Sequence, residues 1–185
     1  KQVQEGREIL SSQNNVKRLN LCIWTAAKTA WLDMEKFDRG RVSAPEFARI
    51  VEREGQRAYM GVDLSSTVAM TAVATGWRLP PVALPADQAE GTDAERAELA
   101  RVAVRVQFFL PEEGLREREE RDSVPYTAWA DAGHIVLTPG NVVDYAFIRK
   151  YVTDSAAEHG AESIGFDPWN ARDTLTTLQS QGLPV

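Results

Sequence analysis

The chain has 185 residues, of which 43% are hydrophobic and 26% are charged, and its formal net charge is -6. This length supports one hydrophobic core with an appended segment. No apolar run is long enough to cross a bilayer. The excess of acidic residues argues against a broad basic surface that would bind nucleic acid. Cys22 is the one cysteine and only two histidines occur, so any metal is expected to be a hard cation bound by carboxylates.

Residues 1–56 are expected to form a helical connector that leads into a domain of residues 57–185. Ser43 and Glu46 have the spacing of a helix capping box, which predicts a helix from about Ala44 to Glu54. The chain begins with Lys1 and not with methionine, so we expect it to be a piece of a longer protein.

The segment 57–64 is predicted to be a buried strand, followed by a polar turn and a second strand, 68–77, that runs back beside it. Side chains alternate along a strand, so Met60, Val62 and Leu64 share one face, and Gly61 and Asp63 share the other. Asp63 therefore ends a core strand, and the glycine two residues earlier leaves room for a ligand to approach the carboxylate.

The middle of the chain is predicted to be less regular. Three prolines in the segment 78–85 and the acidic stretch after it favour a long surface excursion up to residue 101. A strand should follow at 102–110, with Val102, Val104, Val106 and Phe108 on one face. The charge run 112–121 is most simply a solvated helix, and the alternative is a helix that faces DNA through Arg116, Arg118 and Arg121.

The C-terminal half alternates helices and strands. After a short helix at 125–132 and a brief strand at 134–138, Asp144 is predicted to cap an amphipathic helix that ends at Gly160. A strand then leads to Asp167, and a last helix follows it. Strands separated by helices pair in parallel with right-handed crossovers, so the fold class is α/β, with an antiparallel hairpin start and a parallel continuation.

Two strands thus end in the pattern Gly-x-Asp, at Asp63 and at Asp167. If the strands are neighbours, the carboxylates lie about 5 Å apart and repel each other by on the order of 3 kcal/mol. Mg²⁺ or Mn²⁺ would offset this repulsion, and two such ions form the clamp that activates water in phosphodiester hydrolysis. The alternatives are a proton shared by the two acids and carboxylates that only form turns. Asp144 is a further candidate metal ligand, although capping is the favoured role.

Five sequence blocks in order resemble the nuclease domain of the large terminase subunit of tailed bacteriophages. They are GVDLS at 61–65, FFLPEE at 108–113, PYTAW at 125–129, LTPGNVVDY at 137–145 and GFDPWNA at 165–171. A looser likeness covers WLDMEK at 31–36, in the connector from the family's ATPase domain.

The resemblance implies a ribonuclease-H-like fold and an endonuclease that cuts concatemeric double-stranded viral DNA with two divalent metal ions. Asp63 and Asp167 match the family's catalytic metal-binding acids. Double-stranded DNA, the portal protein and the small terminase subunit are the implied partners, with no membrane, in the cytoplasm of the infected bacterium. The family's phosphate loop is missing here, and its third acid belongs to a helix beyond residue 185, so we expect the chain alone to bind metal weakly and to cut DNA poorly.

Two other functions remain open. The segment 61–67 is also similar to the first phosphate loop of actin-like ATPases and sugar kinases, but Pro168-Trp169-Asn170 does not provide the second, glycine-rich loop. The other alternative is a non-catalytic assembly module.

Overall fold

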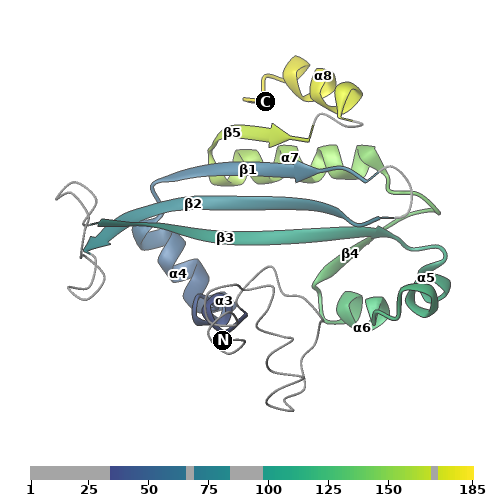
Figure 1. Cartoon of the computed structure of the whole chain (residues 1–185). Helices are drawn as coiled ribbons and strands as arrows, with labels where there is room; N and C mark the ends of the chain where they lie inside the picture. The colour runs from purple at the N-terminus through teal and green to yellow at the C-terminus, as the bar shows by residue number, and fades with distance from the viewer. Residues whose placement is uncertain (1–33, 66–68, 84–97, 168–170) are drawn as a thin grey trace, which may run out of the picture. The chain divides into compact units, whose positions relative to one another are not determined.

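The computed structural model describes residues 34–65, 69–83, 98–167 and 171–185, and the chain divides into two compact units, residues 1–46 and 47–185 (Figure 1). The described part of the first unit contains helix α3 (Met34–Arg39) and the start of helix α4 (Ala44–Glu54), which continues into the second unit. The helix predicted at 44–54 is therefore confirmed. Most of the predicted connector, 1–56, lies outside the described residues, and its domain boundary stays a prediction.

A five-stranded mixed sheet forms the second unit, with the strand order β4-β3-β2-β1-β5. Strand β1 pairs with β2, and β2 with β3, in antiparallel fashion, while β1 with β5 and β3 with β4 are parallel. This arrangement confirms the predicted hairpin start and parallel continuation. The strands are β1 (Arg57–Asp63), β2 (Thr71–Ala83), β3 (Glu98–Pro111), β4 (Ile135–Thr138) and β5 (Ala161–Phe166).

One prediction in the middle of the chain is wrong. Strand β2 continues to Ala83, and β3 already begins at Glu98, where a surface excursion was expected from residue 78 to residue 101. The pairing of β2 with β3 shifts between Leu79 and Val82. Pro80 and Pro81 therefore occupy an irregularity in the ladder, where a strand tolerates residues that donate no amide hydrogen bond.

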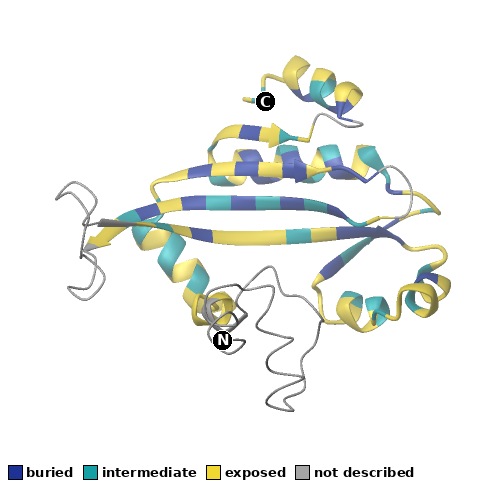
Figure 2. Ribbon diagram, viewed as in Figure 1, coloured by how far each residue is buried: buried dark blue, intermediate teal, exposed yellow. Residues whose placement is uncertain are grey.

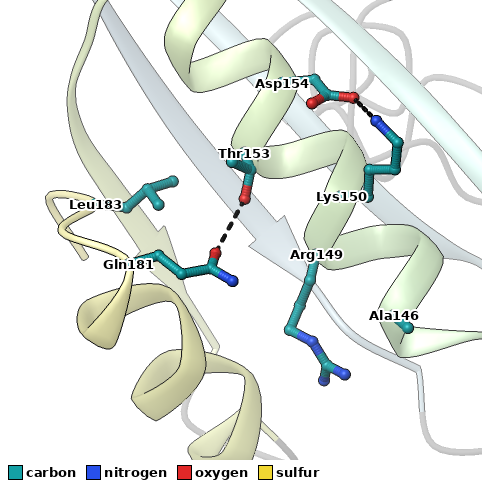
Figure 3. Close-up of a pocket in the computed structure, with 7 residues that line it drawn as sticks. All are labelled: Ala146, Arg149, Lys150, Thr153, Asp154, Gln181 and Leu183. Carbon is teal, nitrogen blue, oxygen red and sulfur yellow. Dashed lines mark hydrogen bonds and ion pairs between the residues drawn. The ribbon is translucent and has the colours of Figure 1, made fainter.

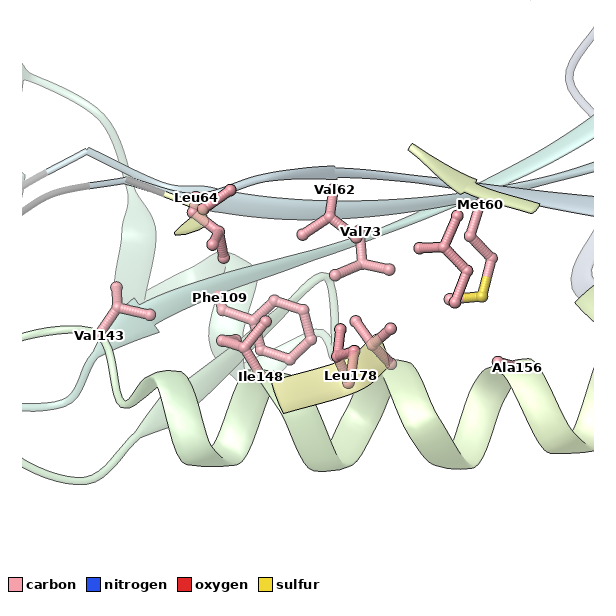
Figure 4. Close-up of a cluster of buried hydrophobic side chains, with 12 residues drawn as sticks. Met60, Val62, Leu64, Val73, Phe109, Val143, Ile148, Ala156 and Leu178 are labelled. Atoms are coloured by element: carbon pink, nitrogen blue, oxygen red, sulfur yellow. The ribbon is translucent and has the colours of Figure 1, made fainter. Parts of the chain in front are cut away.

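The core lies on one face of the sheet, because β1 alternates strictly between buried and exposed residues (Figure 2). Helices α7 (Tyr145–His159) and α8 (Arg172–Ser180) cover this face toward the carboxyl end of β1. Figure 4 shows Met60, Val62 and Val73 of the sheet packed with Ile148 and Leu178 of these helices. At the other end of the same face, α4 packs through Phe47, Ile50 and Val51 against a second cluster formed by Ala58, Trp77, Leu79 and Ala103.

The opposite face carries exposed apolar side chains on β3. Val102, Val104, Val106 and Phe108 share this face as predicted, and between 36% and 60% of each is exposed. Helices α5 (Leu115–Asp122) and α6 (Tyr126–Asp131) connect β3 with β4 and confirm the two helices predicted there.

Candidate functional site

The parallel pairing of β1 with β5 brings the two candidate acids together. Gly61 is aligned with Gly165, and Val62 with Phe166. The backbone amide of Asp167 donates a hydrogen bond to the carbonyl oxygen of Val62, at 3.2 Å. Asp63 and Asp167 each directly follow one residue of the aligned pair Val62 and Phe166, so they lie at the ends of two adjacent strands. Adjacent strands of a sheet are about 4.8 Å apart. The expected adjacency of the strands is confirmed, and the metal-binding role of the two acids stays a prediction.

Two glycines leave open space two residues before each of these acids. A Cβ atom added to Gly61 would meet nothing within 4 Å, and one added to Gly165 would approach only the carbonyl oxygen of Met60, at 3.9 Å. Both Asp63 and Asp167 are exposed to solvent. Two exposed carboxylates with free space beside them are the oxygen donors that Mg²⁺ and Mn²⁺ prefer, so this donor set fits such ions.

Polar contacts hold the end of β1 in place. The amide of Ser65 donates to Oγ1 of Thr71, at 3.0 Å, and that hydroxyl donates to Oγ of Ser65, at 3.2 Å. The hydroxyl of Tyr145 donates to the carbonyl oxygen of Ser65, at 2.7 Å, and so joins the start of α7 to the residues after Asp63. The positioning role of Ser65, Thr71 and Tyr145 was not predicted from the sequence. The sequence feature that could have indicated this role is Thr71, a polar residue at the start of an otherwise apolar strand.

Asp144 caps helix α7. Its Oδ1 accepts hydrogen bonds from the amides of Ala146, at 2.8 Å, and Phe147, at 3.3 Å, which confirms the predicted cap. Among the described residues, no three Asp, Glu, His or Cys side chains lie close enough together to hold a metal ion. Within that part of the chain the site is therefore a pair of carboxylates, and nothing in it supports Asp144 as a third ligand.

The arginines of α5 do not form a common basic surface. Arg118 is 6% exposed, and Arg121 pairs with Asp122 at 2.8 Å. The hydrogen bond from Arg121 lowers the pKa of the Asp122 carboxyl, more than any other contact does. Of the three arginines weighed as DNA contacts, Arg116 alone is exposed and has no ion pair within the described residues, so the solvated-helix interpretation fits α5 better.

Comparison with known proteins gives one consistent relationship. No protein-family model matches the chain. The large terminase subunit of Enterobacteria phage HK97 is 34% identical over 78 residues, which cover 42% of this chain and 16% of that protein. The solved structure of the HK97 large terminase matches over 100% of this chain, with a TM-score of 0.51 and 20% identity. Both matches are to the large terminase subunit of one phage, and the chain is similar to it in sequence over those 78 residues and in fold over its whole length.

The two matches support different statements. The sequence match supplies the relationship, while the structural match, at 20% identity, supports the fold, a five-stranded mixed sheet flanked by helices of the ribonuclease-H-like kind found in terminase. The chain covers 33% of the length of the matched structure, and the matched residues cover 16% of the matched sequence. In the part of the chain that the structure describes, no helix has the length and apolarity needed to cross a membrane.

Proposed function

We propose that this chain is part of a phage large terminase subunit and acts as a divalent-metal-dependent DNA endonuclease that cuts concatemeric double-stranded viral DNA during packaging. The observation that supports it is the adjacency of Asp63 and Asp167 at the ends of two parallel strands, with open space at the glycine two residues before each. Mg²⁺ or Mn²⁺ is the proposed cofactor, with two ions in a complete site.

Each residue of the site has a defined part in the proposed reaction. Asp63 and Asp167 hold the ions at the sheet edge, and Gly61 and Gly165 leave clearance for the phosphodiester to approach them. Thr71 and Tyr145 fix the backbone at Ser65 and so keep the end of β1 rigid. The bound ions would supply an activated water and stabilise the leaving oxygen.

Bound cations also resolve the electrostatic objection to a DNA substrate. A chain with a net charge of -6 repels phosphates, and the two acids add to this repulsion locally. Divalent ions at the pair reverse the local charge. For the longer protein in which such a chain works, we expect contacts with the portal protein and the small terminase subunit, in the cytoplasm of the infected bacterium.

A manganese titration tests the carboxylate pair directly. Ligands that bind the native state raise the unfolding temperature by mass action, so Mn²⁺ should stabilise the wild type and have a much smaller effect on Asp63→Asn and Asp167→Asn. Asp131→Asn, which removes an exposed carboxylate from α6, is the matched control and should respond as the wild type does. Equal responses in all four proteins would favour the assembly module instead.

A further inference from the structure

A cavity of about 450 Å³ lies between helix α7 and the segment that follows helix α8 (Figure 3). Arg149 and Thr153 of α7 and Gln181, which directly follows α8, line it together with the apolar side chain of Leu183. This cavity does not include the acid pair, and the proposed reaction uses none of its residues.

Arg149 is the cationic group of this cavity with the longer ion-pair contact, and Lys150 and Asp154 line the cavity as well. Its side chain is 24% exposed, and its one ion pair in the described part of the chain is a 3.4 Å contact with Asp173, whose own side chain is 88% exposed. A guanidinium has five N–H donors in a planar fork, so a single long contact leaves most of its donors for another acceptor. Lys150, by contrast, pairs closely with Asp154 at 2.6 Å.

Gln181 adds a second donor. The hydroxyl of Thr153 donates to Oε1 of Gln181, at 3.4 Å, which turns the amide nitrogen away from Thr153. Figure 3 shows this nitrogen on the side of Gln181 that faces Arg149. Two donor groups from different segments therefore face one cavity, an arrangement that fits an anion with several acceptor oxygens.

The cavity lies near the edge of the sheet that carries the acids. Helix α7 begins at Tyr145, which contacts Ser65, and Arg149 follows four residues later, about 6 Å along the helix axis. Asp173, the partner of Arg149, lies in the first turn of α8, six residues after Asp167 in the sequence. Along one DNA strand a phosphate recurs about every 3.4 Å of the helix axis, so a strand cut at the acid pair has further phosphates within reach of α7.

We propose that this cavity binds a backbone phosphate of the DNA substrate, a few nucleotides from the bond that is cut, with Arg149 as the bidentate donor and Gln181 as a second donor. The inference rests on the proposed function, because it takes DNA as the substrate. It assigns Arg149 to positioning the strand and not to the chemistry of cleavage. The competing explanation is that the Arg149–Asp173 pair only joins α8 to α7.

The test measures binding of a labelled 20-base-pair duplex by fluorescence anisotropy at several salt concentrations. Ca²⁺ replaces Mg²⁺, so that binding is measured without cleavage. The proteins are the full chain of residues 1–185 and its variants Arg149→Gln, Arg149→Lys and Arg53→Gln. Arg53 is an exposed arginine in the last turn of α4, at the other end of the sheet, and its substitution removes the same charge.

Arg149→Gln removes one charged, bidentate phosphate contact, so this variant should bind the duplex about tenfold more weakly than the wild type. The slope of log affinity against log salt should fall by about 1. Arg149→Lys should recover part of the affinity, and Arg53→Gln should stay within about twofold of the wild type. Unfolding temperatures are measured alongside, because a purely structural ion pair would lower the stability of Arg149→Gln without changing its salt slope.

Other outcomes separate this proposal from the proposed function. If Arg149→Gln binds the duplex as the wild type does, the phosphate site is refuted while the nuclease assignment stands. If the wild type binds no duplex but inorganic phosphate stabilises it and not Arg149→Gln, the cavity takes a free anion and the DNA assignment fails. The Mn²⁺ titration of Asp63→Asn tests the proposed metal site by a separate measurement, and its result does not depend on the duplex-binding experiment.

Discussion

At the scale of single residues, Asp144 distinguishes a structural carboxylate from a functional one. Its Oδ1 already accepts two amide hydrogen bonds at the start of α7. Asp144→Ala should therefore lower the free energy of unfolding by about 1 kcal/mol, whereas Asp144→Asn should keep most of the cap. Urea denaturation measures both. If Asp144→Asn keeps its stability but loses the response to Mn²⁺, then Asp144 is a metal ligand after all.

His159 gives a second prediction at this scale, for pH dependence. Burial lowers the pKa of its imidazole, as does the nearby Arg105, whose Nη2 lies 3.0 Å from Nε2, whereas Glu158 acts in the opposite direction. The neutral ring also packs edge-on against Trp77, with ring centroids 5.1 Å apart. The contribution of His159 to stability should be complete above its unfolded pKa, about 6.5, and should be lost as the pH falls through the lower folded value.

The measurement is the free energy of unfolding between pH 8 and pH 5 for the wild type and for His159→Gln. Part of the wild-type decline toward acid should disappear in the variant. An identical pH profile in the two proteins would show that His159 is not responsible.

At the scale of elements, burial shows where the stable unit begins. Phe47 of α4 packs edge-on against Trp77, with ring centroids 5.5 Å apart, and Trp77 and Leu79 are each only 5% exposed. Residues 57–185 alone should therefore be less stable than residues 44–185 by about 3 kcal/mol or more, because burial of each large apolar side chain contributes about 1.5–3 kcal/mol. Urea denaturation of both chains checks this, and Phe47→Ala in the longer one should reproduce part of the loss. Equal stability of the two would place the boundary at residue 57, where the sequence suggested it.

The elements also show what the sequence could reveal. The helices at 44–54 and 145–159 were predictable, because a capping pattern or an amphipathic stripe is local information. The course of β2 through Pro80 and Pro81 was not, because a strand accepts prolines only where its partner is out of register, and that register depends on β3. The adjacency of Asp63 and Asp167 was suggested by the two Gly-x-Asp strand ends and by the resemblance to the terminase nuclease domain, while the pairing of β1 with β5 itself is long-range information. The cavity at Arg149 was not predictable, since it depends on how α8 packs against α7.

At the scale of the whole molecule, the net charge predicts how the proposed binding of DNA should depend on divalent ions. The chain has a net charge of -6, and two exposed carboxylates stand where the phosphodiester should approach. DNA affinity should therefore depend on divalent ions: the duplex should bind the wild type about tenfold or more tightly in Ca²⁺ than in EDTA at matched ionic strength, because the ions bridge protein and phosphate. In the double variant Asp63→Asn, Asp167→Asn this difference should nearly vanish, while binding in EDTA should improve slightly, since two negative charges are gone. Equal wild-type affinity in Ca²⁺ and EDTA would mean that the DNA contacts do not involve the carboxylate pair.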